Sequence, residues 1–156
     1  MSRRNLGLAP TKFAAEVKDY DVNDFIRDPS LHEHAGLNSQ FALGAATQAW
    51  NRSGLADCDT LDRTRVGLYL GAGEGVLNFD SYQKSSLAGW NPDKREVEGS
   101  NWVAGAQQYI DGADEAAQEP NMPVCHIARE FGLRGPAFNC LTACAASTQA
   151  IGEAWS

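Results

Sequence analysis

Two short apolar runs in the chain each end in a turn of very small residues, and a helical pattern follows each turn. The first run covers residues 65–71 and leads into Gly-Ala-Gly-Glu-Gly at 71–75. The second covers residues 137–141 and leads into Thr-Ala-Cys-Ala-Ala at 142–146. Strands that alternate with helices in this way are typical of layered α/β folds. We therefore predict a largely parallel sheet flanked by helices.

The strongest helical pattern covers residues 38–53. Asn38 or Ser39 can cap its first amides, and Gly54 suits a left-handed C-terminal cap. The residues at helical spacing, which we expect on its packed face, are Phe41, Ala45, Ala46, Ala49 and Trp50. The small side chains on this face favour close packing against a sheet or another helix.

The other elements are shorter. Further helices are expected over about 76–86, from 102 to 110, between Pro120 and a C-cap at Gly132, and over 142–154. Residues 88–101 are expected to form an exposed loop, and the acidic stretch 111–119 is expected to be a solvated loop or helix face.

The composition is that of a soluble globular protein. Of the 156 residues, 43% are apolar and 21% are charged, enough for one domain with a sizeable core. We expect residues 1–12 to be a disordered or frayed N-terminus and residues 13–156 to form the domain. No apolar run approaches the length of a membrane span, and no signal-like run follows the basic N-terminus, so a cytoplasmic location is predicted.

Charge and cysteine spacing exclude several classes of function. The formal net charge is −7, which disfavours nucleic acid as a partner. The four cysteines form no CxxC pair, so neither zinc nor another metal is expected. The turn at 71–75 could cradle a phosphate, but it lacks both the GxGxxG spacing and the P-loop lysine. We therefore expect a tight strand-to-helix turn here rather than a nucleotide site.

Cys144 is the candidate nucleophile. It follows the second strand at the start of a helix, where unpaired backbone amides and the helix dipole favour a thiolate over a thiol. The amide of the same residue can face an oxyanion on an attacked carbonyl. Thr142 and Ala143 shape the turn and are the candidate substrate-binding residues. A cysteine at such a position can also be a small buried residue, and this alternative stays open from the residues alone.

Residues 135–154, Gly-Pro-Ala-Phe-Asn-Cys-Leu-Thr-Ala-Cys-Ala-Ala-Ser-Thr-Gln-Ala-Ile-Gly-Glu-Ala, resemble the active-site segment of β-ketoacyl-[acyl-carrier-protein] synthases. Four other segments resemble the same family in the same order. They start at Glu16, Ser39, Arg65 and Pro120. The resemblance covers roughly residues 13–156. It implies the first half of a thiolase-like fold, in which two similar α/β halves pack together.

The resemblance also implies a chemistry, and this chemistry needs no metal and no organic cofactor. In this family the Thr-Ala-Cys cysteine, here Cys144, takes up an acyl chain as a thioester, and malonyl-carrier protein then condenses with it after losing carbon dioxide. The implied partner is an acyl carrier protein with phosphopantetheine-bound acyl and malonyl groups, and the complete enzyme is implied to be a homodimer. The pathway would be fatty acid or polyketide biosynthesis.

The family takes two catalytic histidines from its second half. His32 and His34 lie in a polar turn and are expected to be exposed, and His126 is expected to be structural. We therefore expect this chain alone to lack condensation activity. Two alternatives remain: a non-catalytic remnant or interaction subunit of a condensing enzyme, and a thiolase-type enzyme that uses coenzyme A thioesters.

Overall fold

The computed structural model describes residue 10, residue 13 and residues 15–156, so the predicted frayed N-terminus lies almost wholly outside the described residues. The α-helices are α1 Leu37–Arg52, α2 Phe79–Gly89, α3 Gly99–Tyr109, α4 Gly112–Ala116, α5 Met122–Phe131 and α6 Ala146–Trp155. The strands are β1 Leu68–Gly71, β2 Trp90–Asn91, β3 Glu96–Val97 and β4 Ala137–Cys140. Short 3-10 turns cover Val22–Asp24, Pro29–His32, Leu55–Asp57 and Ala143–Ala145.

The two predicted strands pair with each other in parallel. β1 and β4 run in register from Leu68 opposite Ala137 to Gly71 opposite Cys140. Both strands therefore end at the same level, and the two small-residue turns leave the sheet side by side. The expected combination of helices and parallel sheet is present, although the parallel sheet in the described part of the chain has only these two strands.

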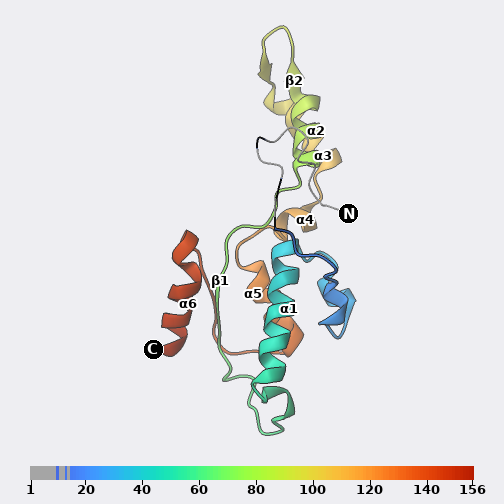
Figure 1. Ribbon diagram of the computed structural model, residues 1–156. Coiled ribbons are helices and arrows are strands. Elements are labelled where there is room, and N and C mark those ends of the chain that lie inside the picture. The colour runs from blue at the N-terminus through green and yellow to red at the C-terminus, as the bar shows by residue number, and fades with distance from the viewer. Residues whose placement is uncertain (1–9, 11–12, 14) are drawn as a thin grey trace.

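Helices lie on both faces of this sheet (Figure 1). Because side chains alternate along a strand, Leu68 and Leu70 share one face of β1, and Tyr69 and Gly71 share the other. The leucines pack against α1 and α5, and the backbone at Gly71 meets α6. The buried core on the α1 and α5 side consists of Leu43, Ile127 and Phe131, with Trp50 and Leu133 partly buried against it.

Helix α1 is present, and its packed face agrees with the predicted one only in part. Ala46 and Trp50 pack against the core as predicted. The buried residues, however, are Ser39, Leu43 and Gly44, and Ala45 and Ala49 are exposed. Long-range partners, rather than the alanine pattern, account for this difference. A Cβ added at Gly44 would run into the hydroxyl of Tyr20, which donates a hydrogen bond to the carbonyl of Gln40.

The ends of the helices test the predicted caps. Gly132 ends α5 with φ of 63°, and Gly54 follows α1 with φ of 75°, so both predicted left-handed positions are confirmed. The predicted N-cap position of α1 at Asn38 or Ser39 is wrong, because the helix begins earlier and its N-cap is Gly36. Asn38 nevertheless bonds one of the first amides, since its Oδ1 accepts from the amide of Ser39 at 2.9 Å.

Residues 79–109 form an arm that projects from the rest of the molecule (Figure 1). α2 and α3 pack along each other, with the short antiparallel β2–β3 hairpin at the tip. Residues 88–101 are mostly exposed, as predicted, but they form the end of α2, the β2–β3 hairpin and the start of α3 rather than a loop. Asn91 explains why: its Oδ1 accepts from the amides of Asp93 and Lys94, and its Nδ2 donates to Glu98 at 2.7 Å.

The acidic stretch is partly helical. Asp111 caps α4 by accepting from the amides of Ala113 and Asp114. These amides hold the pKa of the Asp111 carboxyl below its usual range, because they favour its charged form. No helix among the described residues is long and apolar enough to cross a membrane.

Candidate functional site

Cys144 lies between the end of β4 and the start of α6. β4 ends at Cys140, the 3-10 turn covers Ala143–Ala145, and α6 begins at Ala146. Cys144 is the central residue of this turn, one residue before the N-cap of α6, and its side chain is exposed. The strand, turn and helix predicted around Cys144 thus follow one another along the chain.

The turn before Cys144 is sharp. Ala143 adopts φ of 47°, in the left-handed region that costs a residue with a Cβ about 1–2 kcal/mol. The amide of Ala145 donates to the carbonyl of Thr142 at 3.0 Å and closes the turn. Thr142 and Ala143 therefore make the bend that carries the chain from the sheet into the helix.

Helix α6 sits on β1 through its smallest side chains. Ala146 and Ala150 are buried at 5% and 4% exposure. The opposite side of the helix is exposed instead, with Ile151 at 72% and Trp155 at 92%. Helix α6 can approach β1 closely because β1 has Gly71, which lacks a side chain, at the point of contact.

The first turn of α6 has no side-chain cap. Its N-cap, Ala145, makes no side-chain hydrogen bond, the first turn contains no acidic residue, and the amide of Ala146 donates to the carbonyl of Ala143. The helix dipole, and those amides at a helix start that have no partner, stabilise negative charge, whether on a thiolate or on the oxygen of a tetrahedral intermediate. The arrangement therefore suits nucleophilic attack by Cys144 on a carbonyl.

The other three cysteines have different surroundings. Cys58 Sγ lies 3.6 Å from Thr60 Oγ1, and Cys125 Sγ lies 3.9 Å from Asn121 Nδ2. Both are exposed, and Cys140 is half-buried in β4. Of the four, only Cys144 combines exposure with a position beside the start of α6.

A buried cluster of titratable groups lies between the Pro29–His32 turn and α5. His32 Nδ1 is 2.9 Å from His126 Nδ1, and His32 Nε2 is 3.0 Å from Glu130 Oε2. The other carboxylate oxygen of Glu130 accepts from both the amide and Nε of Arg27. The prediction that His32 is exposed is wrong, because its side chain is only 1% exposed.

The hydrogen bonds of this cluster constrain its protons. An ionised Glu130 requires a proton on His32 Nε2, and a single proton is shared between His32 Nδ1 and His126 Nδ1. His126 Nε2 is buried without a partner. Burial, followed by the charges of His32 and Arg129, lowers the pKa of His126 to about 4. Burial alone would raise the pKa of Glu130, but the hydrogen bonds from His32 and Arg27 outweigh it and keep that pKa below its usual value.

Sequence reasoning missed this cluster. The available signal was the spacing of His126 and Glu130, four residues apart on one helix, which places both on the same face. The third member, His32, is far away in the sequence, and nothing local pairs it with α5. The cluster locks the N-terminal segment to α5.

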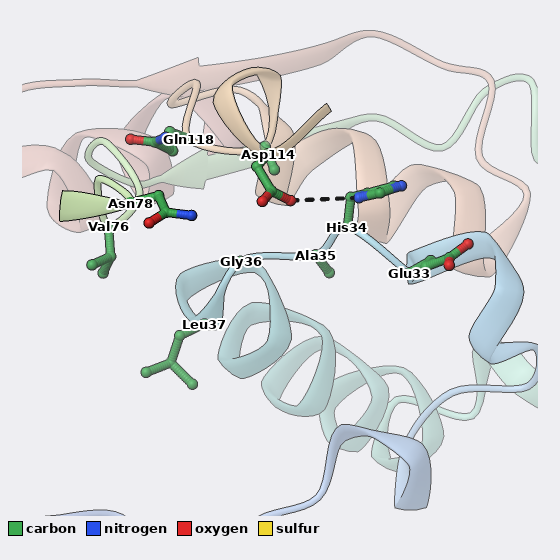
Figure 2. A pocket seen from close by; sticks show the side chains of 10 residues that line it. Glu33, His34, Ala35, Gly36, Leu37, Val76, Asn78, Asp114 and Gln118 are labelled. Carbon is green, nitrogen blue, oxygen red and sulfur yellow. Dashed lines mark ion pairs between the residues drawn. The ribbon is translucent and has the colours of Figure 1, made fainter. Parts of the chain in front are cut away.

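The third histidine lines an open pocket of about 260 Å³ on a different part of the surface. Figure 2 shows this pocket between the start of α1 and α4, with His34 Nδ1 3.6 Å from Asp114 Oδ1. Both side chains are about half exposed, so the pair contributes little. Thr142, Ala143 and Cys144 are not among the pocket's lining residues, and no hydrogen bond joins any of the three histidines to Cys144 within the described chain.

No group of three or more His, Cys, Asp or Glu side chains in the described part of the chain is placed to hold a metal ion.

Several known proteins are similar in sequence to this chain. A family model described as the N-terminal domain of β-ketoacyl synthases matches residues 2–156. A 3-oxoacyl-[acyl-carrier-protein] synthase 2 of Coxiella burnetii is 30% identical over 145 residues, which cover 93% of this chain and 31% of that protein. A putative polyketide β-ketoacyl synthase 1 of Streptomyces cyaneus is 31% identical over 150 residues, covering 93% of this chain and 32% of that protein.

A third relative is nodulation protein E of Rhizobium meliloti. It is 27% identical over 116 residues, which cover 74% of this chain. The chain spans about a third of the length of the first two relatives. The family match covers the small-residue turns, both paired strands and Cys144, and the chain accordingly belongs to the β-ketoacyl synthase family through its N-terminal domain.

Proposed function

We propose that Cys144 is the acyl-accepting nucleophile of a β-ketoacyl synthase. The observation that carries the proposal is the exposed thiol one residue before the N-cap of α6, beside amides that no side chain caps. The Cys144 thiolate attacks the carbonyl of an acyl thioester and gives a tetrahedral oxyanion. Collapse of this intermediate expels the phosphopantetheine thiolate, which takes up a proton, and leaves the acyl group on Cys144.

The second half-reaction is decarboxylative condensation. Malonyl thioester loses carbon dioxide, the resulting carbanion attacks the Cys144 thioester, and the 3-oxoacyl group departs on the carrier as the Cys144 thiolate is released. The developing enolate needs hydrogen-bond donors. His32 and His126 are buried against each other and Glu130, and His34 pairs with Asp114, so we propose that residues outside this chain supply the donors.

The proposed substrate partner is an acyl carrier protein. For the complete enzyme we propose a thiolase-like fold and a homodimer. The names of the Coxiella burnetii and Streptomyces cyaneus relatives support fatty acid or polyketide synthesis as the setting. Thr142 and Ala143 are proposed to border the entering thioester, because they form the bend beside Cys144.

Acylation measured by mass spectrometry tests the proposal. The chain is incubated with an acyl-phosphopantetheine thioester, and the acyl mass is located by peptide mapping. We expect acylation at Cys144, none in Cys144→Ala, and unchanged acylation in the control Cys125→Ala, which removes another exposed thiol. Equal acylation of Cys58, Cys125 and Cys144 would show that Cys144 has no special role.

An interaction subunit is the second candidate function. Four large apolar side chains on β4, the following turn and α6 are exposed: Phe138, Leu141, Ile151 and Trp155. Exposed apolar surface of this kind supports a binding role. Absence of acylation at Cys144 in the folded chain would favour this candidate over the first.

A further inference from the structure

The backbone of β1 comes very close to the first turn of α6 at Gly71. A Cβ added to Gly71 would run into the carbonyl carbon of Ala146 and the amide nitrogen of Ser147, and would lie 2.6 Å from the carbonyl oxygen of Ala146. All three are backbone atoms, so no side-chain rotation could relieve the overlap. Gly71 is also the residue of β1 paired with Cys140, the last residue of β4 before the Cys144 turn.

A side chain of β4 holds the neighbouring part of the β1 turn. Asn139 Nδ2 donates to the carbonyl of Ala72 at 3.2 Å, directly after Gly71. The amide oxygen of Asn139 is buried without a partner, so this donor bond is what the side chain contributes. Because the β1 turn is tied to β4, it cannot retreat from α6 without breaking that bond.

We propose that Gly71 is a positioning residue for Cys144. The bare backbone at Gly71 sets how closely the first turn of α6 lies on the sheet, and therefore where the amides of that turn stand relative to the thiol of Cys144. The effect of a helix start on a nearby charge falls off within one turn, so a small displacement of α6 weakens it. Its meaning for catalysis rests on the proposed function, but the geometry and its test do not require acyl transfer.

The test compares two identical changes in one turn. Gly71→Ala introduces the overlap with α6. Gly73→Ala is the matched control, since a Cβ at Gly73 meets nothing nearer than a Leu141 side-chain atom at 4.0 Å. The measurement is the rate of iodoacetamide labelling at Cys144 relative to Cys125, followed by mass spectrometry at mildly acidic pH on the native chain. We expect Gly71→Ala to lower this ratio by about threefold or more, and Gly73→Ala to leave it within about twofold.

A purely structural role would give a different result. If Gly71 mattered only for stability, Gly71→Ala would lower the free energy of unfolding, yet the molecules that remain folded would keep the wild-type labelling ratio. Circular dichroism and labelling of the half-buried Cys140 report whether the variant folds. If Gly71→Ala does not fold, Asn139→Ala decides. This variant removes the hydrogen bond to the Ala72 carbonyl without placing a side chain between β1 and α6. A lowered ratio supports the proposal, and an unchanged ratio overturns it.

The two proposals fail in distinguishable ways. If Cys144 of the wild-type chain accepts no acyl group, the proposed function is wrong, whatever Gly71→Ala does to alkylation. If Cys144 is acylated and Gly71→Ala labels like Gly73→Ala, only the positioning role of Gly71 is overturned.

Discussion

The two faces of the β1–β4 sheet are covered in opposite ways. On one face α1 and α5 close over large apolar side chains, with Leu43 fully buried and Ile127 and Phe131 nearly so. On the other face the backbone of α6 at Ala146 and Ser147 meets Gly71, and the outer side of the helix carries exposed Ile151 and Trp155. One face is thus covered by a closed hydrophobic core, and the other is covered by a single helix whose outer side is exposed.

The difference separates the buried core from the proposed nucleophile within one small sheet. The α1 and α5 layer contains the buried cluster of large apolar side chains, and it also contains the His32, His126 and Glu130 cluster. The buried residues of α6 are two alanines, and this layer places Cys144 at the surface. Substitutions on the first face should therefore change the free energy of unfolding most, and those on the second should change it less.

The largest effect is expected for Leu43→Ala. Removing a fully buried leucine side chain from a packed core leaves a cavity and should cost about 3–5 kcal/mol in the free energy of unfolding, measured in urea. Ile151→Ala on the open side of α6 is the control, with a change within about 0.5 kcal/mol. Equal losses in the two variants would break the contrast between the faces.

The second effect is a loss of stability in acid. The folded pKa of His126 is about 4, below the ordinary value of 6.5, so the unfolded chain binds the proton first as the pH falls. The stability that neutral His126 contributes is complete above pH 6.5 and is lost as the pH falls toward 4. The loss is about 3 kcal/mol. The lowered pKa of Glu130 adds a further loss in the same direction at still lower pH.

Urea unfolding measured between pH 7 and pH 4.5 checks this dependence. His126→Asn should flatten the slope of the unfolding free energy against pH. His34→Asn should not, because His34 is half exposed beside Asp114. If the slope of the unfolding free energy against pH stays the same in His126→Asn, the loss of stability in acid arises from groups other than His126.

A third effect probes how tightly α6 is seated. Ala150→Leu puts a large side chain where the helix lies on the sheet, and overpacking should cost about 1–3 kcal/mol. Gln149→Leu, at the adjacent exposed position, should change the free energy of unfolding by less than about 0.5 kcal/mol. An unchanged free energy of unfolding in Ala150→Leu would mean that α6 is loosely packed against the sheet.

The smallest effect is expected for Trp155→Ser. The side chain is 92% exposed near the end of α6, so its loss should change the free energy of unfolding by less than about 0.5 kcal/mol. The measurement is made at two protein concentrations. A larger loss that grows with concentration would show that a second copy covers this side of α6.

Local patterns predicted the elements well. The two strands, the helices that follow them and the glycine caps at Gly54 and Gly132 all depend on residues close together in the sequence. The same holds for the strand, turn and helix around Cys144, where a short apolar run and a string of small residues suffice. Backbone preferences and helix periodicity determine such features without reference to the rest of the chain.

Long-range contacts account for what was missed. The packed face of α1 follows Tyr20 at Gly44 rather than the alanine pattern, and His32 is buried because it meets His126 and Glu130. The alanines of α6 are buried because Gly71 lets the helix come close. Each of these depends on a partner far away in the sequence, which no local pattern specifies.

The arm formed by α2, the β2–β3 hairpin and α3 bears on how the chain folds. Its contacts join neighbours in sequence, whereas the β1–β4 pairing joins segments from either side of the arm. Contacts between sequence neighbours form early, and closing a long loop costs more conformational entropy than closing a short one. An arm that collapses first brings Gly71 and Ala137 nearer together, so the order of folding would run from the tip of the arm inward, with the turn that carries Cys144 among the last parts to take shape.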